Sequence, residues 1–237
     1  GKDQFNYQSI GSGAGVSQLK SGTIQFAGSD DPVREEDLKK YQLLQFPMLI
    51  GGVVPVVNLP GVPKGQLKLD GATLASIFLG EIRKWNDPAI ARSNPGVRLP
   101  NLRITVVRRS DGSGTTWIFT NYLSKVSEKW AKGPGNAKDV KWFRGSIGAK
   151  GNPNNVAKTR GSIGSVEYAY AKEANLSTVQ LKNADGKFVA PEVASFAASA
   201  SGADWKNAPN FRVELTNQKG ARAWPITGVT YIVLKKG

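Results

Sequence analysis

Three short segments of the sequence combine glycine, serine and aspartate in a way that suits the binding of a small anion. They are residues 11–15 (GSGAG), 28–32 (GSDDP) and 110–115 (SDGSGT), and each follows an apolar stretch. We predict that each apolar stretch is a strand and that each loop opens a helix. Because helix N-termini carry N–H groups without internal partners and a positive dipole end, the three loops indicate an anion site.

The loops also carry hydroxyl and carboxylate groups that could face such an anion. In an open α/β sheet the carboxyl ends of the strands line the binding crevice, which places Ser12, Asp30 and Ser113 on one side of the fold. The alternative is that the Ser and Asp side chains only cap the helix that follows each loop. For any one loop taken alone, this alternative remains open.

Arg109 stands beside the third loop and adds a cation to the predicted site. A guanidinium can bind oxyanion oxygens bidentately, and the carboxylate of Asp111 two residues later can fix its orientation. Ser113 is not predicted to be a nucleophile, because the sequence contains no histidine to complete a Ser-His-Asp triad.

Asp30 needs a separate explanation, since a carboxylate next to an anion is repulsive unless the ligand carries a proton. Phosphate is protonated at neutral pH and sulfate is not. We therefore hypothesise that Asp30 accepts a hydrogen bond from protonated phosphate and rejects sulfate, at a cost of roughly several kcal/mol for the wrong anion.

The composition narrows the function classes further. The 237 residues include 32 Lys and Arg against 18 Asp and Glu, a net charge of +14, with no Cys and no His. These absences argue against thiolate or histidine metal sites and against most hydrolases, and the acidic residues near the loops are too few for a site with two metal ions.

The basic residues are scattered, so nucleic-acid binding is not predicted, although Trp142-Phe143-Arg144 leaves it as an alternative. No apolar run approaches the length of a membrane span.

Strands alternating with helices predict an α/β fold. Residues 43–59 suit buried strands linking one sheet to another, and we expect a hinge between lobes in this stretch. The remaining predictions are strands at 5–10, 23–27, 103–108 and 228–234, helices at 16–20, 33–40, 73–85 and after 115, and a hairpin at 185–186.

Several of these segments together resemble the periplasmic phosphate-binding proteins of high-affinity phosphate ABC transporters. The most specific is Val106–Thr115 (VVRRSDGSGT). The others are Tyr7–Gly15, Phe26–Pro32, Phe46–Gly52, Leu69–Trp85, Gly164–Ala171 and Leu215–Ile226, so the resemblance extends over nearly the whole chain.

The resemblance implies a two-lobe periplasmic-binding-protein fold of type II, with the ligand in the cleft between the lobes. The first lobe would comprise residues 1–57 and 228–237, and the second residues 58–227, with the hinge in the crossing strands. Family members have an additional strand and helix before the position of Gly1 and helices after Gly237, so we expect the first lobe to be incomplete here. Residues 152–161 are shorter than in the family, and Ser165 replaces a common aromatic.

For function, the resemblance implies an extracytoplasmic (periplasmic) receptor that captures inorganic phosphate and delivers it to the membrane-embedded permease of an ABC importer. We expect a monomer that is not an enzyme and uses no cofactor, metal or nucleic acid. Asp111 would hold Arg109 in place. The implied phosphate-binding residues are Ser12, Asp30, Arg109, Ser113, Gly114 and Thr115. The remaining alternative is a receptor for another tetrahedral anion, and arsenate should compete because it is protonated.

Overall fold

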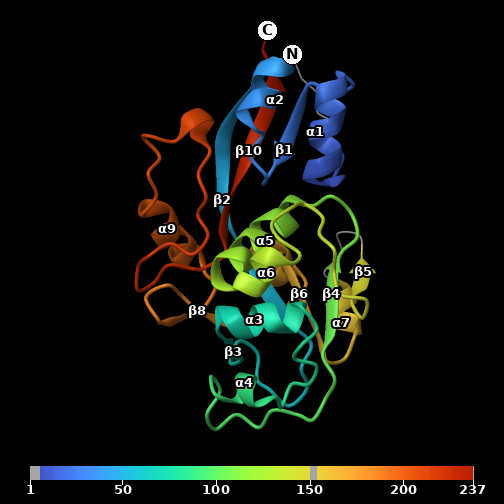
Figure 1. The fold of residues 1–237 in the computed structure, drawn as a ribbon, viewed down its shortest axis with the longest axis vertical. Coiled ribbons are helices and arrows are strands. Elements are labelled where there is room, and N and C mark those ends of the chain that lie inside the picture. The colour runs from blue at the N-terminus through green and yellow to red at the C-terminus, as the bar shows by residue number, and fades with distance from the viewer. Residues whose placement is uncertain (1–5, 150–153, 237) are drawn as a thin grey trace.

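The computed structural model describes residues 6–149 and 154–236, which form two α/β lobes (Figure 1). The lobes are stacked along the long axis of the molecule. Two long strands, β2 (Leu43–Val57) and β10 (Thr227–Lys235), lead from the first lobe to the point where the lobes meet. The α/β prediction is confirmed.

The first lobe contains a three-stranded antiparallel region and two helices. β10 lies in the middle and pairs with both β1 (Phe26–Ser29) and the first part of β2. Helices α1 (Gly11–Ser21) and α2 (Glu35–Lys40) pack on these strands. The core of this lobe is small and consists of Val16, Leu19, Ala27, Val33, Leu38, Leu43 and Val233.

The second lobe continues the same sheet from the end of β2. The strand order is β2, β6 (Ser162–Glu167), β4 (Thr105–Arg109) and β5 (Ile147–Ala149), with β4 parallel to both of its neighbours. Because β4 and β6 are parallel, their carboxyl ends meet at the same edge of the sheet, which is the edge that faces the first lobe. Helix α5 (Gly114–Val126) follows β4 directly.

Shorter elements complete the molecule, and three fully buried tryptophans anchor the large core of the second lobe (Trp85, Trp130 and Trp224). The remaining helices are α3 (Gly71–Phe78), α4 (Pro88–Ala91), α6 (Glu128–Lys132), α7 (Asn154–Lys158), α8 (Tyr168–Glu173), α9 (Val193–Ser201) and the 3-10 turn η1 (Pro209–Phe211). The remaining strands are β7 (Ser177–Thr178), which pairs with β2, and the small sheet of β3 (Lys68–Leu69), β8 (Gln180–Lys182) and β9 (Phe188–Val189).

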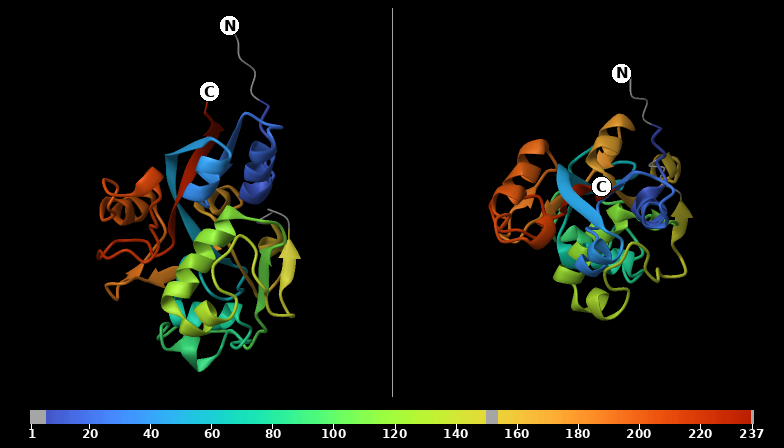
Figure 2. Two further views of the ribbon diagram at one scale, coloured as in Figure 1. Left: turned by 45° about the horizontal axis from the view of Figure 1, so that its top comes forward. Right: turned by 90° about the horizontal axis from the view of Figure 1, so that it is seen from above.

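β2 links the two lobes as one uninterrupted strand of 15 residues. It pairs with β10 up to Gly52 and with β6 from Val53 onward. A Cβ at Gly52 would lie 2.1 Å from the Phe196 ring, so α9 can pack here only against a residue without a side chain. Seen from above, α9 and α1 lie on opposite sides of β2 (Figure 2). Residues 43–59 link the two lobes, but they do so within one continuous sheet and not between two sheets as predicted. The hinge stays a prediction.

Other predicted boundaries were wrong. Of the strand predicted at 5–10, Phe5 lies outside the described residues and residues 6–10 form no strand. The GSGAG segment is not a turn before a helix, because α1 begins at Gly11 and includes it. The helix expected over 73–85 ends at Phe78, since Gly80 has a φ of +75° that cannot continue an α-helix. Ile82 and Trp85 are buried, but they lie beyond the helix.

The other predictions held with small shifts. The strands predicted at 23–27 and 103–108 are β1 and β4, each displaced toward its carboxyl end, and the helix predicted at 33–40 begins at Glu35. The hairpin at 185–186 is present between the antiparallel strands β8 and β9. The final strand is β10.

The first lobe leaves apolar side chains of β2 exposed. They are Leu44, Phe46, Met48, Leu49 and Ile50, each more than 40% exposed. In the described part of the chain, β1 pairs with β10 alone and so forms an edge of the sheet. Both features agree with the expectation of an incomplete first lobe. No helix among the described residues is long and apolar enough to cross a membrane.

Candidate functional site

A cavity of about 1470 Å³ extends from the junction of the two lobes along α1 to residues 23–26 of the first lobe. The part of this cavity at the junction is the cleft, and it receives side chains from both lobes. The first lobe contributes residues from α1, from the loop after β1 and from β10. The second lobe contributes the ends of β4 and β6 and the N-terminus of α5. All of the predicted site residues line this cleft: Ser12, Asp30, Arg109, Asp111, Ser113, Gly114 and Thr115.

Ser12 and Asp30 form the first-lobe side of the site. Ser12 is buried in the first turn of α1, and its Oγ accepts a hydrogen bond of 3.2 Å from the Asp30 backbone N–H. Neither residue is a helix cap, since the residue before α1 is Ile10 and the residue before α2 is Arg34. The alternative that these two side chains only cap helices is therefore wrong.

Thr230 on β10 holds the Asp30 carboxylate in place. Its Oγ1 donates to Asp30 Oδ1 at 2.7 Å. The two residues meet because Ser29, the last residue of β1, pairs with Tyr231, so Asp30 follows opposite Thr230. The register between β10 and β2 shifts at this position, between Thr230 and Tyr231, and such bulges re-aim side chains beside functional sites. Burial raises the pKa of Asp30, while the Thr230 hydrogen bond and the charge of Arg109 oppose that rise.

Arg109 and Asp111 form a bidentate pair on the second-lobe side. Arg109 Nε and Nη2 donate to the two carboxylate oxygens of Asp111 at 2.6 and 2.5 Å. The Asp111 hydrogen bonds raise the pKa of Arg109 still further, so the guanidinium stays charged. The structure therefore brings Asp111 and Arg109 together as predicted, and the role of Asp111 in holding Arg109 for a ligand stays a prediction. The other guanidinium N–H groups are left for other acceptors.

The N-terminus of α5 lines the cleft and lies against Ser12 and Asp30 of the first lobe. Ser113 is 1% exposed, and its Oγ caps the helix by accepting the Thr116 N–H at 3.2 Å. Gly114 and Thr115 begin the helix, so their N–H groups have no acceptor within it. A Cβ at Gly114 would lie 2.2 Å from Ser12 Oγ, so only glycine allows the two lobes to approach this closely.

The backbones of the two lobes also touch beside this point. The Gly13 N–H donates to the Gly112 carbonyl at 3.0 Å, which joins the first turn of α1 to the loop before α5. The predicted residues of the two lobes therefore face one another at a point where the lobes are in direct contact.

Glu167 is a cleft residue that sequence reasoning missed. It ends β6, and its Oε1 accepts a hydrogen bond of 3.1 Å from Thr115 Oγ1. Burial raises its pKa, and the nearby charge of Asp30 raises it further. The signal that could have found Glu167 is its position at a strand-to-helix junction, between β6 and α8, which the predicted residues share. Thr230 had no comparable signal. Among the described residues, no cluster of acidic side chains suited to a metal ion is present.

Comparison with known proteins then decides the family. A model described as a PBP superfamily domain matches residues 2–237. The phosphate-binding protein PstS of Pasteurella multocida is 54% identical over 99% of the chain, which covers 69% of that protein. The PstS protein of Haemophilus influenzae is 51% identical over 99% of the chain, which covers 71% of that protein.

The chain belongs to the PstS family of phosphate-binding proteins. It spans about two thirds of the length of these relatives. The relatives of this chain are named as binding proteins and not as enzymes, which supports the prediction that the chain is not an enzyme.

Solved structures agree on the PstS-family fold. A phosphate-binding protein from Stenotrophomonas maltophilia superimposes with a TM-score of 0.70 at 20% identity, covering 95% of this chain and 70% of that one. A periplasmic phosphate-binding protein solved with phosphate at pH 8.5 gives 0.68 at 22% identity, covering 95% and 72%. The predicted type II two-lobe fold with an incomplete first lobe is confirmed.

Proposed function

We propose that the chain is an extracytoplasmic receptor that captures inorganic phosphate in the interlobe cleft and passes it to the permease of an ABC importer. The observation that carries this proposal is the convergence of Arg109, the N-terminus of α5, and the Ser12–Asp30 pair on one closed gap. A cation, a helix N-terminus and hydroxyl groups around one gap suit a small oxyanion.

The groups around the cleft keep hydrogen-bond donors that their partners within the protein do not use. Arg109 offers the guanidinium N–H groups that Asp111 does not bind, and Gly114 and Thr115 offer backbone N–H groups at the helix start. The Oγ atoms of Ser12 and Ser113 accept backbone N–H groups, so each hydroxyl proton can be donated to a phosphate oxygen.

Asp30 would provide the discrimination between protonated and unprotonated anions. Thr230 binds Oδ1, whereas Oδ2 lies on the side of Gly114, 2.9 Å from where a Cβ of that residue would be. A carboxylate held in this way accepts the proton of a phosphate P–OH group. Sulfate has no proton to give at pH 7, so it would leave a buried carboxylate facing an unprotonated oxygen, at a cost of roughly several kcal/mol.

The organisation into lobes completes the proposal. We place the first lobe at residues 1–57 and 228–237 and the second at residues 58–227, with the hinge where β2 and β10 pass between them. The receptor would act as a monomer in the periplasm. Capture would consist of closing the Ser12–Asp30 side onto the Arg109 side.

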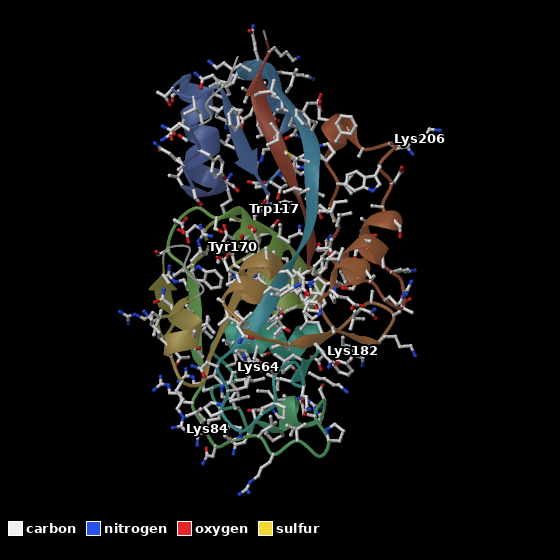
Figure 3. The ribbon with its side chains drawn as sticks, turned by 180° about the vertical axis from the view of Figure 1, so that it is seen from behind. Lys64, Lys84, Trp117, Tyr170, Lys182 and Lys206 are labelled. Carbon is white, nitrogen blue, oxygen red and sulfur yellow. The ribbon has the colours of Figure 1, made fainter. Side chains whose placement is uncertain are left out.

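The basic surface fits a receptor better than a nucleic-acid-binding protein. Lys64, Lys84, Lys182 and Lys206 are exposed and lie in separate parts of the molecule (Figure 3). A net charge of +14 spread in this way attracts anions without forming one continuous binding face.

Calorimetric titration of the ligand-stripped protein at pH 7 tests the function. We expect tight binding of phosphate, competition by arsenate and no heat from sulfate. Asp30→Asn should lose affinity for phosphate and narrow the gap between phosphate and sulfate. Asp185→Asn, which makes the same charge change in the exposed β8–β9 turn, is the matched control. Absence of phosphate binding would overturn the function, and unchanged discrimination in Asp30→Asn would overturn the filter.

A further inference from the structure

An ion pair outside the anion site joins the two lobes. Lys138 Nζ lies 2.6 Å from Asp31 Oδ2, and the side chain of Asp31 is only 17% exposed. Asp31 follows β1 in the first lobe, whereas Lys138 lies between α6 and β5 in the second. Neither residue is among those proposed to contact phosphate.

The first-lobe end of this pair is attached to the anion site. Asp31 is the chain neighbour of Asp30, and its carbonyl accepts the Ser29 hydroxyl at 2.7 Å. Ser29 is 1% exposed and is the last residue of β1. A displacement of Asp31 therefore moves Asp30 as well.

The second-lobe end is attached to the site in the same way. The Lys138 carbonyl accepts the backbone N–H of Ser113 at 3.0 Å, directly before α5. The preceding residue, Ala137, bonds to the Thr120 hydroxyl of α5 through both its N–H and its carbonyl, at 3.2 and 3.1 Å. Lys138 therefore moves as one unit with the helix start that offers the Gly114 and Thr115 amides.

We propose that Lys138 and Asp31 form an interlobe clamp that positions the two halves of the anion site against each other and slows the release of bound phosphate. This inference rests on the proposed function. Exposed ion pairs contribute little, because two long side chains lose conformational freedom and water screens their charges. Here both backbones are fixed by hydrogen bonds and the carboxylate is mostly shielded, so more of the attraction remains.

The clamp also affects the charge near the ligand. Asp31 raises the pKa of Asp30 through its negative charge, and Lys138 is the cation paired with Asp31. Removal of Lys138 alone would leave an unpaired carboxylate beside the site, which is worse than removing both partners. This difference makes the pair suitable for a double-mutant cycle.

The test measures the release of radiolabelled phosphate after addition of excess unlabelled phosphate to the wild type, Lys138→Met, Asp31→Asn and the double variant. We expect Lys138→Met to release phosphate roughly 10-fold faster, equivalent to about 1.4 kcal/mol. The double variant should be less impaired than the two single effects combined. The charge-exchanged variant Asp31→Lys/Lys138→Asp should recover part of the retention, which a purely structural role for either side chain would not produce.

Lys141→Met is the matched control, because Lys141 is an exposed lysine three residues further along the same segment. Thermal unfolding of each variant separates loss of the clamp from loss of the fold. If the wild type binds phosphate and Lys138→Met releases it no faster than Lys141→Met, the clamp is wrong and the receptor function stands. If the wild type itself fails to bind phosphate, both proposals are wrong.

Discussion

The two sides of the cleft differ in what they can offer an anion. The second lobe presents a cation held by a carboxylate and the N-terminus of a 13-residue helix, both of which attract any oxyanion. The first lobe presents Ser12 and the Asp30 carboxylate, which Thr230 holds by one oxygen. Under the proposed function the attraction would come from one lobe and the discrimination from the other, so selective binding would require both lobes to close on the same ligand.

Among the changes that test the difference between the two lobes, removal of the Arg109 cation should have the largest effect on phosphate affinity. In Arg109→Met the ligand loses its charged donor, and we expect the dissociation constant for phosphate to rise roughly 10²- to 10³-fold. Calorimetry measures this change. Arg109→Lys is the informative companion, because it keeps the charge but cannot bind Asp111 and the ligand with one planar group. If Arg109→Met stayed within tenfold of the wild type, the second lobe would not be the source of the attraction.

An obstruction between the lobes should have the next largest effect. Gly114→Ala places a Cβ against Ser12 and Asp30, and overpacking of this kind costs about 1–3 kcal/mol, equivalent to roughly 10- to 100-fold in affinity. Thermal unfolding shows separately whether the same overpacking also lowers the stability of the ligand-free protein. Gly112→Ala is the control, because a Cβ there meets only Gly13 Cα at an ordinary 3.6 Å. Equal affinities for the two variants would show that the lobes need not approach so closely.

Glu167 gives the smallest and most specific effect. Its anionic form repels a bound anion, and its raised pKa means that this repulsion disappears at a higher pH than for an ordinary glutamate. Glu167→Gln keeps an acceptor for the Thr115 hydroxyl but removes the charge. We expect the variant to bind phosphate about threefold more tightly than the wild type at pH 8. The ratio of the two affinities, which cancels the titration of phosphate itself, should fall toward one as the pH drops through the raised pKa.

Glu167→Gln should also stabilise the ligand-free protein more at high pH than at low pH, as it does for phosphate binding. A carboxyl group with a raised folded-state pKa contributes stability that is fully present below its unfolded-state pKa and is lost as the pH rises through the folded-state value. Glu167→Gln should therefore melt higher than the wild type at pH 8, with a smaller difference in acid. A difference in melting temperature that does not change with pH would contradict this account of Glu167.

Local patterns in the sequence predicted the parts of the site that are set by local structure. A strand end, a loop of small polar residues and a helix start lie within ten residues of one another, so Arg109, Asp111 and Ser113 could be found together. The GSGAG segment lies at the cleft, but it belongs to α1 and is not the predicted turn. Its glycines weaken a helix, yet the close contact of Gly13 with Gly112 helps to fix that helix start in the folded protein.

Residues missed by the sequence analysis depend on contacts between distant parts of the chain. Thr230 reaches Asp30 across 200 residues, Lys138 reaches Asp31 across 107, and Glu167 reaches Thr115 across 52. Strand register and lobe packing set these contacts, and neither leaves a periodic signal in one sequence. The boundaries of the lobes remain predictions for the same reason.

The strand order of the first lobe also determines when the anion site can form during synthesis. β1 and β2 do not pair with each other, because β10 lies between them. β10 forms hydrogen bonds with β1 along one edge and with the first part of β2 along the other. The second lobe needs only Trp224 and Ile226 from the last part of the chain to complete its core, whereas the sheet that carries Asp30 must wait for the whole strand Thr227–Lys235. Ser12 and Asp30 are thus among the first residues of the site to be synthesised and the last to be set in place.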